Sequence, residues 1–194
     1  MDSHSHDAFV ARLGGVHRTV CGNGQRILDM IMRTSTEMLL DRGMVSVSRD
    51  RDEHGFRVHG WDANGNEHIR LILCTEDRLG VRLTRTLLEE ADNLDVLILV
   101  SIEGPTPFAR KECNLHRVQF FTAAKMCVNV TRHALVPRHT QISSPPLGIE
   151  VDCLPKLLEH DAVAQYYNWK CGTIVRIERL FGGHEPVVYY RVVV

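Results

Sequence analysis

The sequence predicts an α/β protein (α+β overall), with an N-terminal α/β domain and a small C-terminal mixed α/β domain. Three observations predict this class. Short alternating apolar and polar segments stand beside segments of helical periodicity. The continuous apolar run at residues 95–101 is typical of a strand covered on both faces, as in a β-α-β crossover. Beyond residue 130 proline-rich segments and two β-rich runs replace this pattern, so we predict a domain boundary near Val130 and Thr131.

Composition bounds the possible functions. The chain has 194 residues, of which 44% are hydrophobic and 24% charged, an ordinary balance for one large or two small domains. The net charge is −1, whereas an autonomous nucleic-acid binder usually carries a strongly basic domain or stripe. Nucleic-acid contact is therefore expected to be weak and to occur within a larger assembly. No apolar run approaches the roughly 18 residues of a membrane span, so we expect no membrane partner.

The first segment is predicted to be a flexible tail over residues 1–24. Two clusters of glycine, Gly14-Gly15 and Gly22-Asn23-Gly24, interrupt it. It also lacks the continuous apolar stretch of a secretory signal. We therefore expect an intracellular protein whose first domain begins at residue 25.

Residues 25–130 are predicted to form the N-terminal domain. Apolar positions in residues 25–42 share one helical face, and Gly43 can adopt a left-handed helix cap. Three short strands follow, and the last two are separated by a strong turn at residues 62–66. They predict a small β-meander, with strands over residues 44–48, 56–59 and 69–74.

A crossover pattern follows the meander. Residues 84–90 favour a helix, and residues 95–101 form the buried strand. Thr106 can cap a short helix that begins at Pro107. The pattern then predicts, in this order, a helix and a strand over residues 118–125 and 126–130.

Residues 131–194 are predicted to form the C-terminal domain. Several prolines break the backbone before a short helix at residues 161–167, which Asp161 can cap. Two β-rich runs, residues 173–179 and 187–194, join across Gly182-Gly183 as a hairpin.

Cysteine and histidine spacing gives no metal site and no cofactor. The six cysteines include no C-x-x-C pair, and the histidines are scattered. Without a signal peptide, we expect reduced and mostly buried thiols. No residue is therefore assigned to a metal or to a cofactor.

Catalytic motifs are also absent. The chain has no phosphate-binding glycine loop and no nucleophile elbow. A metal-dependent nuclease could be assembled from Asp62, Glu67 and Asp77, because paired carboxylates near a strand can hold a metal. However, Asp62 lies in a predicted turn, and the other two carboxylates bracket the strand. We therefore predict that the protein is not an enzyme and keep the nuclease as the least favoured alternative.

Aromatic residues gather near the C-terminus. Tyr166, Tyr167 and Trp169 lie in one segment, and Tyr189-Tyr190 in another. In so small a domain they serve either its own core or a partner's pocket. Both interpretations stay open at this stage.

The C-terminal half resembles RNA polymerase subunit 5, which the nuclear RNA polymerases share and which has an archaeal equivalent. H-A-L-V-P-R-H at residues 133–139 resembles the family's H-x-L-V-P-x-H motif, and Leu154-Pro155 its next Leu-Pro. D-A-V-A-Q-Y-Y at residues 161–167 resembles its D-P-V-A-R-Y-F/Y helix. Residues 172–176 and 190–193 resemble its last two strands. Upstream, L-D-R-G at residues 40–43 and T-P-F-A at residues 106–109 are similar to its N-terminal domain, so the likeness covers roughly residues 25–194.

The resemblance implies a non-catalytic subunit of a multisubunit DNA-directed RNA polymerase. In this family an N-terminal jaw domain lies beside downstream duplex DNA, and a C-terminal assembly domain binds the largest subunit. The residues implied in DNA proximity are Thr106, Pro107, Arg110 and Lys111. Those implied in assembly are His133, Leu135, Val136, Pro137, His139, Asp161, Tyr166, Tyr167, Tyr190 and Arg191.

Some positions depart from the family. A proline-rich piece, residues 143–152, replaces a helical segment, and Ala162 stands where the family has proline. These departures favour a copy from a large DNA virus or a distant protist. The expected location is the nucleus if the protein is cellular, and the virion or a cytoplasmic viral factory if it is viral. The alternative function is a free-standing adaptor that keeps the assembly fold outside a polymerase.

Overall fold

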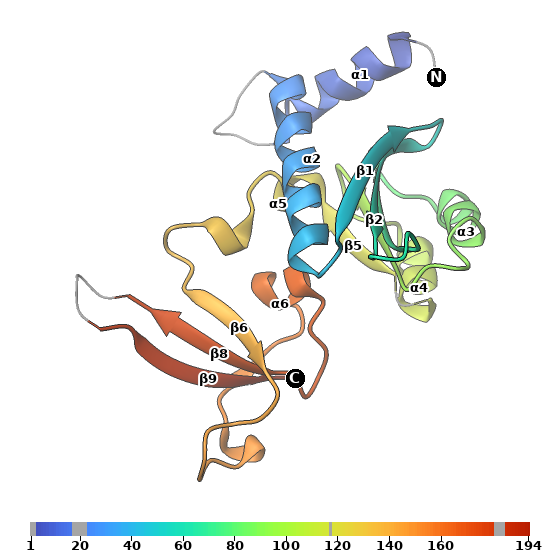
Figure 1. The fold of residues 1–194 in the computed structure, drawn as a ribbon. Coiled ribbons are helices and arrows are strands. Elements are labelled where there is room, and N and C mark those ends of the chain that lie inside the picture. The colour runs from blue at the N-terminus through green and yellow to red at the C-terminus, as the bar shows by residue number, and fades with distance from the viewer. Residues whose placement is uncertain (1–2, 17–22, 117, 181–184) are drawn as a thin grey trace. The chain divides into compact units, whose positions relative to one another are not determined.

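A computed structural model describes residues 3–16, 23–116, 118–180 and 185–194 (Figure 1). The chain divides into two compact units, Met1–Val128 and Asn129–Val194, called here the N-terminal and C-terminal units. The boundary predicted near Val130 and Thr131 lies a few residues beyond this division.

The N-terminal unit is built on a five-stranded mixed sheet of order β1-β2-β3-β4-β5. The first three strands pair antiparallel, as predicted for the meander. β3 pairs parallel with β4, which confirms the predicted crossover, and β4 also pairs parallel with β5. The strands are β1 (Ser46–Arg51), β2 (Gly55–Trp61), β3 (Glu67–Cys74), β4 (Val96–Ser101) and β5 (Gln119–Thr122).

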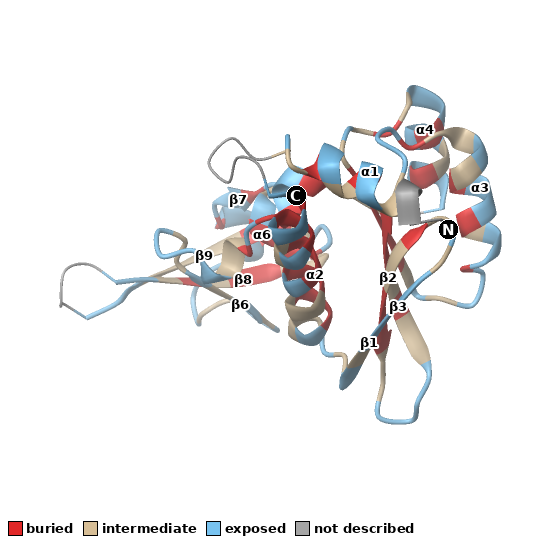
Figure 2. Ribbon diagram, turned by 90° about the horizontal axis from the view of Figure 1, so that it is seen from above, coloured by how far each residue is buried: buried red, intermediate tan, exposed pale blue. Residues whose placement is uncertain are grey.

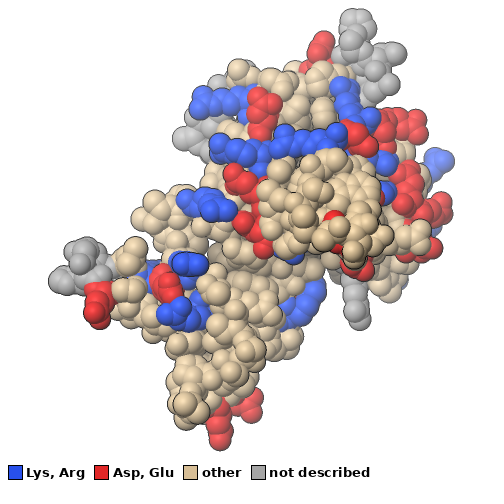
Figure 3. Space-filling model, viewed as in Figure 1, with Lys and Arg blue, Asp and Glu red and all other residues tan. Residues whose placement is uncertain are grey.

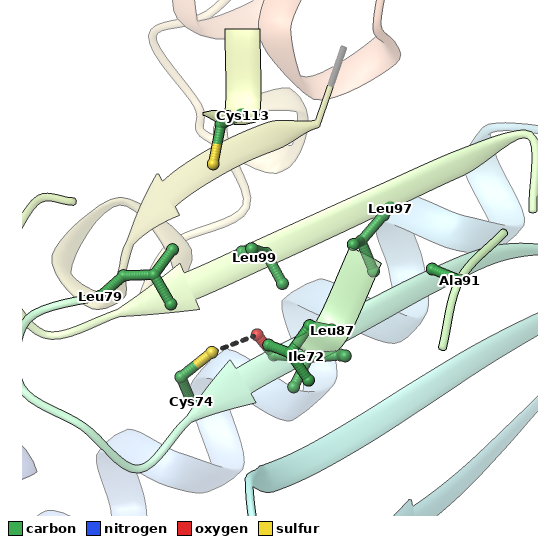
Figure 4. Close-up of a cluster of buried hydrophobic side chains, with 8 residues drawn as sticks. All are labelled: Ile72, Cys74, Leu79, Leu87, Ala91, Leu97, Leu99 and Cys113. Carbon is green, nitrogen blue, oxygen red and sulfur yellow. Dashed lines mark hydrogen bonds between the residues drawn. The ribbon is translucent and has the colours of Figure 1, made fainter. Parts of the chain in front are cut away.

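Two helices cover one face of this sheet. α3 (Val81–Glu89) connects β3 to β4, and α4 (Pro107–Leu115) connects β4 to β5. Their apolar side chains pack on alternate residues of β3 and β4, because successive strand residues point to opposite faces. The buried cluster comprises Ile72, Cys74, Leu79, Leu87, Ala91, Leu97, Leu99 and Cys113 (Figure 4).

Helix α2 (Gly24–Asp41) packs on the opposite face of the sheet. Its Leu39 lies beside Gly60 of β2, on the face that carries the fully buried Leu71 and Leu73. Figure 2 shows buried residues along α2, β2 and β3. The predicted stop signal is confirmed, since Gly43 follows the helix with a φ of 94°.

Helix α1 spans Ser3–Leu13, so the flexible tail predicted for residues 1–24 is wrong over this stretch. Phe9 and Leu13 are fully buried, and their spacing of four residues puts both on one side of the helix. In the sequence, the two glycine clusters favour a loop more strongly than this pair of apolar residues favours a helix. The remainder of the prediction, over residues 17–22, lies outside the described residues.

The helix predicted at residues 118–125 and the strand predicted at 126–130 are also wrong. The structure has the opposite order, β5 and then the short helix α5 (Ala123–Met126). Two adjacent phenylalanines in β5 suit a strand, and Leu99 of β4 lies opposite the first of them. Pairing with a strand distant in the sequence decided this segment.

The C-terminal unit has a four-stranded sheet of order β6-β8-β9-β7, with one helix packed on it. The predicted hairpin is confirmed by the antiparallel pairing of β8 and β9, while its glycine turn lies outside the described residues. The predicted helix capped by Asp161 is confirmed as α6. The elements are η2 (Val130–Arg132), β6 (Arg138–Ile142), η3 (Val151–Cys153), β7 (Lys156–Leu157), α6 (Ala162–Tyr167), β8 (Ile174–Arg179) and β9 (Val187–Val193).

The cysteines that the structure describes are unpaired thiols. Cys74, Cys113 and Cys127 are buried, whereas Cys153 and Cys171 are exposed. Burial raises the pKa of the Cys74 thiol to about 12 and also raises the pKa values of Cys113 and Cys127. These three thiols are therefore inert packing groups, since the thiolate is the reactive form.

Candidate functional site

The segment at residues 133–139 forms a turn that leads into β6. The backbone N–H of Val136 donates to the carbonyl of His133 at 2.9 Å. The N–H of Leu135 donates to Nδ1 of the same histidine at 3.3 Å, so that Nδ1 carries no proton. The turn holds Leu135 outward, with 83% of its surface exposed.

His139 stabilises the C-terminal end of the same turn through a hydrogen bond to Pro137. Its Nδ1 lies 2.7 Å from the carbonyl oxygen of Pro137, and because a carbonyl only accepts, Nδ1–H is the donor. Burial lowers the pKa of His139, which favours the neutral ring. The two histidines of the motif thus use opposite tautomers to fix the backbone, and Val136 packs against the core of the unit.

Helix α6 supplies the next predicted residues. The carboxylate of Asp161 accepts hydrogen bonds from the N–H groups of Val163 at 2.9 Å and Ala164 at 3.5 Å. Tyr166 is buried, and Tyr167 stacks on Trp169 with ring centres 4.8 Å apart. These aromatic side chains contribute to the unit's own core, which decides much of the question that the sequence left open.

Asn129 belongs to this group, although the sequence did not single it out. Its side-chain oxygen accepts from the N–H of Thr131 at 2.9 Å, and its Nδ2 donates to the hydroxyl of Tyr166 at 3.1 Å. Only the first contact has a sequence signal, an asparagine two residues before the residue it caps. The second joins residues that are 37 positions apart.

Tyr190 and Arg191 lie on β9 and fix the neighbouring segments. Tyr190 packs against a small cluster that includes Leu154 and Ile174. Arg191 donates to the carbonyl of Lys156 on β7 at 3.1 Å. The predicted assembly residues thus act largely within the C-terminal unit, and Leu135 is the one among them with a largely exposed apolar side chain.

The residues predicted near DNA lie at the start of α4. Thr106 accepts a hydrogen bond from the N–H of Ala109 at 3.3 Å, and Pro107 occupies the first turn, as predicted. Arg110 and Lys111 are exposed. Over the face shown in Figure 3, basic and acidic side chains are interspersed and form no continuous basic patch.

An exposed apolar stripe on α4 was not predicted. Phe108 is 74% exposed and Leu115 is 67% exposed. Because they are seven residues apart, both lie on the same side of the helix. The sequence signal was available in this spacing, but an apolar pair in a short helix more often points into a core.

The three carboxylates of the nuclease alternative are not brought together. Asp62 accepts N–H groups within its turn, and these bonds together with His68 hold its pKa well below the usual range. Glu67 accepts from Arg70 at 2.8 Å, while Asp77 pairs with Arg12 at 2.6 Å. Glu67 is the first residue of β3 and Asp77 follows the end of that strand, so about 23 Å of strand separates the last two. This alternative has no geometric support.

Clusters of metal-ligating side chains and membrane-spanning helices were sought in the part of the chain that the structure describes. There, no group of three or more His, Cys, Asp and Glu side chains could hold a metal ion. Within the same ranges, no helix is both long and apolar enough to cross a bilayer.

Comparison with known proteins gives a match for the C-terminal unit. Residues 128–193 match the family model described as RNA polymerase Rpb5, C-terminal domain. This range nearly coincides with the unit Asn129–Val194.

Longer alignments reach into the N-terminal unit. The chain is 24% identical over 132 residues to the Caenorhabditis briggsae "DNA-directed RNA polymerases I, II, and III subunit RPABC1", covering 61% of this chain and 63% of that protein. It is 26% identical over 191 residues to the Arabidopsis thaliana "DNA-directed RNA polymerases IV and V subunit 5B", covering 83% and 87%. A Dictyostelium discoideum relative, named as a subunit of RNA polymerases I, II and III, is 30% identical over 95 residues, covering 42% and 48%. The chain thus spans 62–63% of the length of the nematode relatives it matches.

Proposed function

We propose that this chain, whose residues 128–193 match the C-terminal domain of RNA polymerase subunit 5, is a non-catalytic subunit of a multisubunit DNA-directed RNA polymerase. The observation that carries the proposal is the match of one compact unit to a polymerase-subunit domain. Its partners are then the other polymerase subunits, which supply the catalytic residues for transcription.

The C-terminal unit is the proposed anchor on the largest subunit. A unit of this size buries a small core, and docking on a larger chain adds burial that it cannot supply alone. Exposed apolar side chains support this role, since exposed apolar surface marks interaction sites. They are Leu135, Leu147, Ile149, Val151, Leu158, Leu180, Val187 and Val194.

The N-terminal unit is the proposed part of the jaw beside downstream duplex DNA. Arg110 and Lys111 at the start of α4 are the proposed phosphate contacts, with Thr106 and Pro107 fixing the turn before them. The net charge of −1 is consistent with few phosphate contacts. Such contacts position DNA inside a larger enzyme, although they are too few to bind DNA independently. The proposed location is that of the polymerase: the nucleus for a cellular chain, and the virion or a cytoplasmic viral factory for a viral one.

A tagged pull-down of the full chain from native cells or infected extract tests this function. The two largest polymerase subunits, identified by mass spectrometry, are the expected co-purifying chains. Their cellular or viral sequences also decide the location. Recovery of folded, abundant protein without either subunit would contradict the proposal and leave the adaptor alternative.

A further inference from the structure

Strand β6 (Arg138–Ile142) is an unpaired edge of the C-terminal sheet. It pairs with β8 along one side, from Arg138 opposite Glu178 to Ile142 opposite Ile174, without a register shift. Among the described residues, none makes a backbone hydrogen bond to the other side of β6. The strand therefore presents N–H and C=O groups in the spacing that another extended chain would match.

The other sheet edges are protected, and β6 is not. Edge strands usually avoid pairing through charges, bulges or short length. β1 carries three consecutive charged residues, Arg49, Asp50 and Arg51, while β7 has two residues and β5 four. In β6, Arg138 is the single charged residue beside the neutral His139, and no proline interrupts the strand.

Exposed apolar residues precede and follow β6 in the chain. Leu135 precedes the strand and is 83% exposed. Leu147 follows it and is fully exposed. A strand added to β6 gains burial where its side chains cover exposed apolar ones such as Leu135, three residues before the strand begins.

Charge indicates which kind of strand fits. Residues directly opposite in a ladder share a face, so Arg138 and Thr140 of β6 lie beside Glu178 and Arg176 of β8. Arg176 pairs with Glu178. Among these four residues the face therefore carries two arginines and one glutamate. A second copy of β6 would bring the same arginines together, whereas acidic side chains would complement them.

We propose that β6 binds an extended acidic segment of a polymerase subunit by β-strand addition. The inference rests on the proposed function and deepens it, because it names the strand that docks and the chemistry of the segment received. The five residues of β6 provide about 17 Å of edge. The added segment places acidic side chains beside Arg138 and apolar ones toward Leu135.

The first test uses the tagged full chain and its recovery of the large polymerase subunits. Thr140→Glu puts a negative charge in the middle of the edge, and Arg138→Glu reverses the charge that attracts the segment, so both variants repel an acidic strand. Each variant is expected to lower recovery by about tenfold, which corresponds to about 1.4 kcal/mol. Ser46→Glu, at an exposed position of β1, is the matched control and is expected to recover the wild-type amount.

The outcomes separate the two proposals. If the wild type recovers no polymerase subunit, the proposed function fails, and this inference with it. If the wild type and Thr140→Glu recover equal amounts, strand addition fails while the function stands. If the isolated chain sediments as a dimer that Thr140→Glu dissociates, the occupant is a second copy, which overturns the acidic partner.

A second readout does not depend on how well the variants fold. An otherwise wild-type chain carries the photo-crosslinker p-benzoylphenylalanine in place of the exposed Gln141, and the cross-linked peptide of the assembled complex is sequenced. An acidic segment is expected, together with slowed hydrogen exchange of the β6 amides in the complex. A peptide without acidic residues, or unchanged exchange, would overturn the proposal.

Discussion

The side-chain amide of Asn129 donates a 3.1 Å hydrogen bond to the hydroxyl of Tyr166, and both residues are buried. The bond ties the first residue of the C-terminal unit to its helix α6. Asn129→Ala is expected to lower the free energy of unfolding by about 1–2 kcal/mol, because it removes a buried polar contact. Tyr166→Phe and the double variant complete a cycle in chemical denaturation. Strictly additive losses would show that the two groups are not coupled.

Proline at position 162, the residue expected from the family resemblance, should stabilise the chain. Ala162 is the first residue of α6, where proline is favoured because its missing N–H is not needed there. Asp161 has φ −56° and ψ 143°, which is the conformation allowed before proline. Ala162→Pro is therefore expected to raise the free energy of unfolding by about 0.5 kcal/mol. Gln165→Pro is the control and should destabilise by about 3 kcal/mol, because it removes the 2.8 Å hydrogen bond from the Gln165 N–H to the carbonyl of Asp161.

Gly24 is predicted to be irreplaceable where α1 meets α2. A Cβ atom built there would lie 1.7 Å from the carbonyl oxygen of Val10, which is backbone and cannot rotate away. Gly24→Ala is expected to cost about 1–3 kcal/mol, seen as a lower thermal unfolding midpoint. Gly104→Ala is the control, since its nearest new contact is 3.8 Å away at the end of the flexible Arg110. Equal midpoints for the two variants would argue against the packing of α1 on α2.

His68 should make stability depend on pH. Its Nδ1 contacts Asp95, and its Nε2 lies 3.0 Å from Asp62, so hydrogen bonds to both carboxylates require the protonated ring. The hydrogen bond to Asp95, followed by that to Asp62, raises the pKa of His68 above its usual 6.5.

The direction of this effect follows from the raised pKa. The folded chain holds the proton more tightly, so the stabilisation is complete below the unfolded pKa and is lost as pH rises through the folded one. Unfolding midpoints from about pH 5 to about pH 9 should therefore show a smaller loss for His68→Gln than for the wild type. His160→Gln, at an exposed position, should behave as the wild type. Identical pH profiles of the unfolding midpoint for all three proteins would show that His68 does not make stability depend on pH.

Arg110 and Lys111 are expected to affect DNA contact without affecting assembly. In the assembled polymerase, Arg110→Ala with Lys111→Ala should weaken the hold on downstream duplex most at low salt. The slope of log affinity against log salt should fall by up to about 2, from two phosphate contacts. Lys170→Ala in the C-terminal unit is the matched control. An unchanged slope with normal incorporation would contradict the DNA role of these residues.

Local signals in the sequence determined much of the fold. Asp41, Arg42 and Gly43 predicted the end of α2, where the structure has Gly43 at a φ of 94°. Thr106 predicted the start of α4, and Asp161 the start of α6. Each of these signals acts within a few residues, through a cap or a backbone conformation that the amino-acid type favours by itself.

Only the tertiary structure decided the remaining elements and the roles of the site residues. β5 is a strand because β4 lies beside it, and α1 is a helix whose Phe9 and Leu13 are buried. The motif at residues 133–139 was found in the sequence, but its exposed Leu135 and the open edge of β6 emerged from the fold. Pairing and burial join residues far apart in the chain, and their free energy exceeds local preferences that differ by about 1 kcal/mol per residue or less. A sequence pattern records those local preferences, whereas the contacts that override them exist only once the chain has folded.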